Sequence, residues 1–235
     1  IYKKNLPLMK LLLNEEKIDI NIMNPKKKTP LTLCVDIGFF KGFDLIVQNK
    51  NFDPKRSLLD ETLLCCNDDK AAILLSLDCI DVNYNSINSN KKDNIMTPLI
   101  HFTLNSSYNI VKLIVNHHSF NKNKSRLNTA IEKSIIKGHD LNIFNLLFNF
   151  LGNEINEILF DGLDLLCFTA LHSQKSFVSS VLNSEFFDAE KCDIVKAFWL
   201  SYGPNSLKGN EKHDIMETIY EFDKKHDKKI DLTKL

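Results

Sequence analysis

Glycine, proline and tryptophan are scarce in this chain, whose 235 residues include seven glycines, six prolines and one tryptophan. Glycine and proline mark turns, so their scarcity beside many short apolar segments predicts a mostly helical protein with brief connections. No apolar run approaches the roughly 20 residues that span a bilayer. The N-terminus also lacks the basic, apolar and small-residue series of a secretory signal. We therefore predict no association with a membrane.

The chain also has no net charge, because 30 Lys and Arg residues balance 30 Asp and Glu residues. Each half of the sequence is nearly balanced as well. A protein that binds nucleic acid or an anionic membrane through its surface needs a basic surplus, so we expect neither partner. The 43% hydrophobic content is enough to build a core, which predicts a folded, soluble and globular protein.

Motifs of metal centres and of common enzymes are absent from the sequence. The six cysteines form no C-x-x-C pair and no zinc-like spacing with histidine, so we expect buried thiols and no metal. This use of cysteine predicts a reducing intracellular compartment, the cytoplasm. We find no G-x-S-x-G, G-x-x-x-x-G-K-[ST], G-x-G-x-x-G or H-E-x-x-H. The sequence thus predicts no catalytic residues, no cofactor and no enzymatic activity.

Internal repetition is the main signal that the sequence does contain. The tripeptide Thr-Pro-Leu occurs at Thr29–Leu31 and again at Thr97–Leu99. Thr62 lies almost midway between the two threonines, and Thr129 follows Thr97 at a similar interval. A second apolar group recurs at the same three offsets from the start of each unit. Its members are Phe43, Ile46 and Val47; Val111, Ile114 and Val115; Ile143, Leu146 and Leu147; and Val178, Val181 and Leu182, counted from Asp164. The same spacing makes Met9, Leu12 and Leu13 the second helix of a unit that lacks its first half.

The ends of the units support the same period. Gly38 and Gly138 lie at the same distance after the threonines of their units, where a first helix must end and turn back. Similar Asp and Asn phrases close several units, as in Asp19-Ile20-Asn21 and Asp81-Val82-Asn83. A threonine hydroxyl accepts a hydrogen bond at a helix start, and proline suits the first helical position. We therefore predict that Thr29, Thr97 and Thr129 are helix caps.

Taken together, these features resemble ankyrin repeats: a period of about 33 residues, Thr-Pro-Leu, Gly138-His139 and a closing Asp-Val-Asn. The resemblance covers residues 1–190, with a partial first repeat, and implies an all-α, ankyrin-like helical repeat solenoid of about six to seven helix pairs. Residues 191–235 are expected to form a divergent final helical pair that acts as a C-terminal cap. The unit at Thr62 lacks the proline and glycine, and the polar stretch 84–95 predicts an elongated finger loop. We also expect that the chain is a piece of a longer protein or that more repeats precede Ile1.

The resemblance further implies that finger turns and first helices line a concave face that grips another protein. The family's variable positions fall just before each unit threonine and in the last turn of the first helix that follows it. The expected partner-binding residues are Lys26, Lys28, Asp36, Ile37, Asn94, Met96, Leu104, Asn105, Arg126, Asn128, Ile136, Lys137, Leu171 and His172. Alternatively, helix boundaries lie one residue away and these side chains are core, because one residue rotates a helix position by about 100°.

We accordingly predict a monomeric, non-enzymatic scaffold that binds an unidentified protein partner. A second hypothesis is a regulatory or targeting ankyrin segment of a larger polypeptide that carries a catalytic or ligase-recruiting domain. A third is another helical solenoid, such as a HEAT-like stack, which projecting hairpin turns would exclude. Trp199 lies in an apolar run and is predicted to be core.

Overall fold

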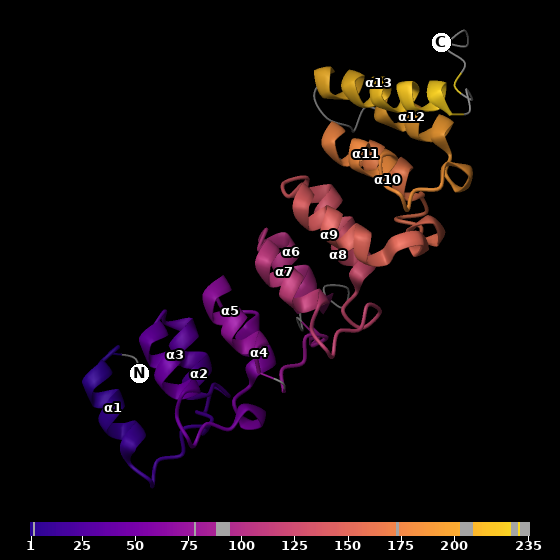
Figure 1. The fold of residues 1–235 in the computed structure, drawn as a ribbon. Helices are drawn as coiled ribbons and strands as arrows, with labels where there is room; N and C mark the ends of the chain where they lie inside the picture. The colour runs from indigo at the N-terminus through magenta and orange to yellow at the C-terminus, as the bar shows by residue number, and fades with distance from the viewer. Residues whose placement is uncertain are drawn as a thin grey trace. The chain divides into compact units, whose positions relative to one another are not determined.

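The chain is all-α, and a computed structural model describes residues 1, 3–77, 79–87, 95–172, 174–202, 209–226 and 230 (Figure 1). The α-helices are α1 (Leu6–Asn14), α2 (Pro30–Asp36), α3 (Phe40–Val47), α4 (Leu59–Leu63), α5 (Asp68–Leu75), α6 (Pro98–Leu104), α7 (Tyr108–Val115), α8 (Leu127–Lys137), α9 (Leu141–Leu151), α10 (Leu165–His172), α11 (Lys175–Leu182), α12 (Ile194–Tyr202) and α13 (Gly209–Lys225). Three short 3-10 helices span Pro54–Arg56, Gly152–Glu157 and Ala189–Lys191. Two short strands, β1 (Ser86–Ile87) and β2 (Ile95–Met96), pair antiparallel.

Beyond the single repeats, the helices divide between two compact structural units. The first unit contains α1–α5, the second contains α8–α13, and the α6–α7 hairpin contributes to both. Consecutive helices pair within each unit, as α2 with α3 and α10 with α11. The pairs then stack in order: first helices contact first helices, as α8 contacts α10 and α10 contacts α12, while second helices contact second helices, as α9 contacts α11 and α11 contacts α13. Each unit is therefore a row of helical hairpins, in keeping with the repeated apolar spacing of the sequence.

Two of the three predicted threonine caps are confirmed. Thr29 Oγ1 accepts a hydrogen bond from the Thr32 N–H at 3.3 Å, and Thr97 Oγ1 accepts one from the Ile100 N–H at 3.2 Å. Each hydroxyl also donates to a carbonyl of the following hairpin, that of Ser57 at 3.1 Å and that of Ser125 at 2.9 Å. Both threonines are fully buried, so each cap also ties its hairpin to the next one.

Thr129 is not a cap, and this prediction was wrong. Helix α8 begins at Leu127, so Thr129 lies inside its first turn, and the capping position belongs to Arg126, which has a φ of 57°. Helix α4 behaves in the same way: it begins at Leu59, ahead of Thr62, after Leu58 with a φ of 50°. Proline disrupts a helix interior, so it fixes the start where it follows the threonine. The repeats at Thr62 and Thr129, which lack that proline, begin their first helix earlier, by about one turn.

The three threonines should therefore respond differently to alanine. We expect Thr29→Ala and Thr97→Ala each to lower the free energy of unfolding by about 1–2 kcal/mol, because each loses a cap and leaves a buried carbonyl without its donor. Thr129→Ala should stay within about 0.5 kcal/mol of the starting protein. Urea denaturation followed by circular dichroism measures the three values. Equal losses at Thr129 and Thr97 would contradict this assignment of caps.

An asparagine at three of the closing turns makes a second recurring set of hydrogen bonds; Asn21 is buried, and Asn83 and Asn156 are half-buried. Asn21 Oδ1 accepts from the Asp53 N–H at 2.9 Å and from the Ser57 hydroxyl at 3.0 Å, and its amide donates to the Asn51 carbonyl at 2.9 Å. Asn83 makes the same three bonds, and their partners are Asn121 N–H, Ser125 hydroxyl and Ser119 carbonyl, at 2.8, 2.7 and 2.8 Å. In the second unit Asn156 repeats two of them, from Asp188 N–H and to the Phe186 carbonyl. These bonds join each of the three turns to the turn that closes the next hairpin.

The apolar spacing of the second helices places their side chains in the core. Phe43, Val111 and Val178 are completely buried, and Ile46, Ile114 and Val181 are at most 1% exposed. Helix α12 departs from the expectation at Trp199, which is 42% exposed. This helix buries Ile194, Ala197, Phe198 and Ser201, so Trp199 lies one position beyond that buried stripe.

Among the residues that the structure describes, no helix is both long enough and apolar enough to cross a lipid bilayer.

Candidate protein-binding face

The candidate residues that follow each unit start share one location, the C-terminal end of a first helix. Asp36 ends α2, Leu104 ends α6, Lys137 ends α8 and His172 ends α10. Their candidate neighbours are adjacent in sequence, so each helix presents two candidate side chains in its last turn or just beyond it. We call these positions, together with the candidate residues of the finger turns, the candidate face.

No described residue of the candidate face is buried. Ile136 is the most exposed of its apolar members, at 48%. Ile37, Met96, Leu104 and Leu171 are half-buried. The alternative that a one-residue shift makes these side chains core therefore does not apply to them. Asn94 lies outside the described residues.

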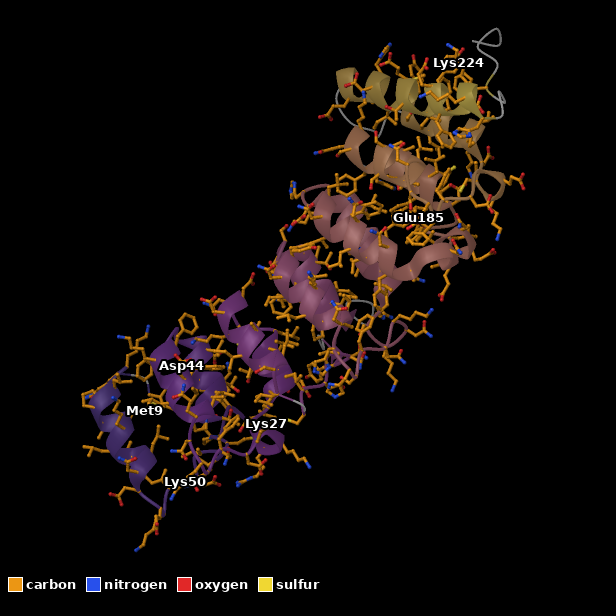
Figure 2. All side chains as sticks on the ribbon, viewed as in Figure 1. Met9, Lys27, Asp44, Lys50, Glu185 and Lys224 are labelled. Atoms are coloured by element: carbon orange, nitrogen blue, oxygen red, sulfur yellow. The ribbon has the colours of Figure 1, made fainter. Side chains whose placement is uncertain are left out.

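In the first unit, an asparagine builds the finger turn that carries the lysines. Asn24 Oδ1 accepts from the Lys26 N–H at 2.9 Å and the Lys28 N–H at 3.0 Å, and the Asn24 N–H donates to the Lys28 carbonyl at 2.9 Å. Lys27, labelled in Figure 2, has a φ of 57° in this turn. The Lys28 ammonium forms an ion pair with the Asp36 carboxylate at the far end of α2. The structure thus brings two predicted residues, one from the finger and one from the helix, into contact.

Cys65 belongs to the same part of the surface, although the sequence did not point to it. This exposed thiol lies just past the end of α4. Partial burial of its sulfur raises the pKa of Cys65, the Asp36 carboxylate raises it further, and the Lys28 ammonium lowers it. Helix α4 also contacts α2, which ends at Asp36. The unit at Thr62 has no Thr-Pro-Leu, so we carried no candidate residue onto it, and the structure supplies the missing position.

The longer finger holds Met96 through backbone pairing. Strands β1 and β2 pair Ser86 with Met96 and Ile87 with Ile95, directly before the Thr97 cap. Tyr84 precedes this hairpin, and its hydroxyl lies 3.4 Å from Glu61 Oε1 of α4. Burial and the Glu61 charge raise the pKa of Tyr84. The finger is thereby tied to the first helix of the preceding pair.

In the second unit, the candidate face combines apolar and polar side chains. Leu104, Ile136 and Leu171 supply the apolar part. His172 lies against Phe168 of the same helix, with ring centroids 4.6 Å apart. Three further polar residues belong to α8: Arg126 has the left-handed conformation just before the helix, Asn128 is exposed in its first turn, and Lys137 ends it. Asn105 is exposed just past the end of α6.

Two further groups bear on the chemistry of the surface. His101 in α6 is half-buried, and burial lowers its pKa, which favours the neutral ring. On α13 the exposed side chains of His213, Asp214 and Glu217 bring potential ligand atoms within 4.8 Å of one another. Among the described residues, they form the one group of three or more such side chains that could hold a metal ion. Exposed acidic groups of this kind are common on helices without an ion, so we assign them no site.

Comparison of the chain with protein-family models, with curated proteins and with solved structures finds no match.

Proposed function

We propose that this chain is an ankyrin-type helical repeat solenoid that acts as a non-enzymatic scaffold and binds another protein through the candidate face. The observation that carries the proposal is the structure of the repeated helical hairpin. A threonine caps a first helix after a hairpin turn, and the same hydroxyl reaches the next hairpin at Ser57 or Ser125.

The hairpin turns favour an ankyrin-type arrangement over a HEAT-like stack. The turn at Asn24–Lys28 is closed by backbone hydrogen bonding, and the longer turn before Thr97 carries the paired strands β1 and β2. In a stack of plain helix pairs these polar turns would have no structural counterpart. Both lie immediately before a Thr-Pro-Leu cap, where the ankyrin resemblance places its fingers.

The composition of the candidate face suits the recognition of a protein. In the second unit, Leu104, Ile136 and Leu171 offer apolar area, and Lys137 and His172 adjoin it with groups that form polar contacts. Protein interfaces commonly have an apolar centre and a polar rim. Leu104 and Leu171 are already half-buried, so they lose less conformational freedom on binding than fully exposed side chains would.

The proposal is tested by changing the apolar part of the face. We expect Leu104→Asp together with Ile136→Asp to abolish specific capture of a partner from the source lysate, because two charges would have to be buried in the complex. Both side chains are partly exposed, so circular dichroism should show unchanged helical content.

The matched control is Leu113→Asp together with Leu159→Asp, which changes two leucines that are 44% and 68% exposed outside the candidate face. This variant should capture the same partner as the starting protein. Capture that survives the first pair of substitutions would remove the binding site from these helices. The absence of any specifically captured protein would contradict the scaffold function itself.

A further inference from the structure

Helix α1 exposes an unusual amount of apolar surface. Leu8, Leu11 and Leu12 are 51%, 66% and 44% exposed, and we call these three side chains the α1 face. Met9 of the same helix is only 6% exposed and lies between α1 and α3 (Figure 2). Large apolar patches on soluble proteins commonly mark an interaction surface.

The other second helices show what normally covers this face. Their N-caps provide a common origin: Asn5 caps α1, and Phe39, Asn67 and Gln174 hold that position in α3, α5 and α11. The residue three positions after the cap is Leu8 in α1. Its counterparts in α3, α5 and α11 are Gly42, Lys70 and Phe177.

Each of these counterparts faces the second helix of the pair that comes before it in the chain. A Cβ on Gly42 would lie 3.0 Å from Met9 Sδ of α1. Lys70 forms an ion pair with Asp44 of α3, with Nζ and Oδ1 2.5 Å apart. The Phe177 ring centroid lies 5.2 Å from that of Phe144 in α9. The same position of α1 therefore faces the side from which a preceding helix would come.

The seventh position after the cap leads to the same conclusion. Ile46 in α3, Leu74 in α5 and Val181 in α11 are 1%, 0% and 0% exposed. The residue at this position of α1 is Leu12, which is 44% exposed. Leu12 is thus an apolar residue at a position that is buried in the other second helices, but in α1 it is exposed to solvent.

We propose that the α1 face is the stacking surface of a further helical pair that precedes α1 in the same polypeptide. The second helix of that pair lies along Leu8 and Leu12, as α1 itself lies along Gly42 and Ile46. In α3, α5 and α11 the helix that covers this face comes from the immediately preceding helical pair. We therefore assign a preceding pair, and not another partner, to the α1 face. The surface is distinct from the candidate face, because it belongs to a second helix.

The chain's own segments supply the test. Residues 29–66, which contain α2, α3 and α4, are placed directly ahead of Asn5 in an extended protein. Asn5 then takes the place that Asn67 has after α4. The exchange is matched, because Asn5 Oδ1 accepts from the Leu8 N–H at 3.0 Å and Asn67 Oδ1 from the Lys70 N–H at 3.2 Å. The copy carries Asp44→Leu, because Leu8 takes the place of the Lys70 that pairs with Asp44. This copy of α3 can then cover α1 as α3 covers α5.

We expect the extension to raise the melting temperature by roughly 5–10 °C, the shift that burial of two leucines gives in a chain of this size. Leu8→Asp together with Leu12→Asp should remove this gain from the extended protein. In the 235-residue chain the same pair should move the melting temperature by no more than about 2 °C, because both side chains are already exposed.

Ile22→Asp together with Met23→Asp is the control, since these residues are 60% and 54% exposed but lie outside α1. The control should leave the gain intact. Equal effects of the Leu8 and Leu12 substitutions with and without the extension would overturn the proposal. So would light scattering that finds the original chain to be a dimer and the variant a monomer, because a second copy would then be the occupant.

Discussion

Phe144→Ala is expected to lower the free energy of unfolding by about 3–5 kcal/mol, the usual loss when a fully buried phenylalanine is truncated. Phe144 is completely buried in α9, and its ring lies 5.5 Å from Phe148 and 5.2 Å from Phe177 of α11. The substitution therefore leaves a cavity within a pair and weakens the contact between neighbouring second helices. Urea denaturation followed by the fluorescence of Trp199, the sole tryptophan, reports on the same unit.

Phe150→Ala is the matched control for this experiment. Phe150 lies in the same helix but is 43% exposed. Its removal should therefore cost less than about 1 kcal/mol. If the two alanine variants unfolded at the same urea concentration, the apolar contact between α9 and α11 would not be the stabilising element that the structure indicates.

Asn21→Ala should lower the free energy of unfolding by about 2–4 kcal/mol, because three hydrogen bonds are lost at a site that is 5% exposed. The Asp53 N–H and the Asn51 carbonyl lose their partners in this variant. Far-UV circular dichroism during urea denaturation measures the loss in the first unit, which has no tryptophan.

Asn51→Ala makes the same chemical change at an exposed side chain and keeps the backbone carbonyl to which Asn21 donates. It should change the free energy of unfolding by no more than about 0.5 kcal/mol. A loss at Asn51 as large as that at Asn21 would show that the closing turn does not depend on the buried amide.

The sequence predicts the order of the helices well, because the spacing of the apolar residues agrees with the positions of the capping and turn residues. Thr29 and Thr97 are correct as caps since proline follows each of them and disfavours an earlier helix start. Thr129 fails because the residues ahead of it are compatible with a helix, so the threonine alone does not fix the boundary. Trp199 fails for a similar reason: an apolar run does not show which of its members faces the core.

The candidate face is predictable only in part. Positions such as Asp36 and Ile136 could be carried over from the ankyrin resemblance by counting from a threonine, and the structure leaves them accessible. Cys65 could not be found in this way, because its unit lacks the motif from which to count. The bonds of Asn21 were equally hidden, since the sequence shows an asparagine in a turn but not the distant Asn51 carbonyl that it reaches.

The asparagine and threonine bonds have a longer spacing than the hairpins themselves. Thr97 follows Thr29 by the same interval that separates Ser125 from Ser57, while the intervening α4–α5 hairpin has no Thr-Pro and the turn after α3 has no asparagine in the place of Asn21 or Asn83. The chemically equivalent module is thus a doublet of hairpins. Deletion of a single hairpin from such an array would leave these threonine and asparagine side chains without their hydrogen-bond partners. Deletion or duplication of a whole doublet would keep every bond. The array therefore tolerates changes in length by two hairpins at a time.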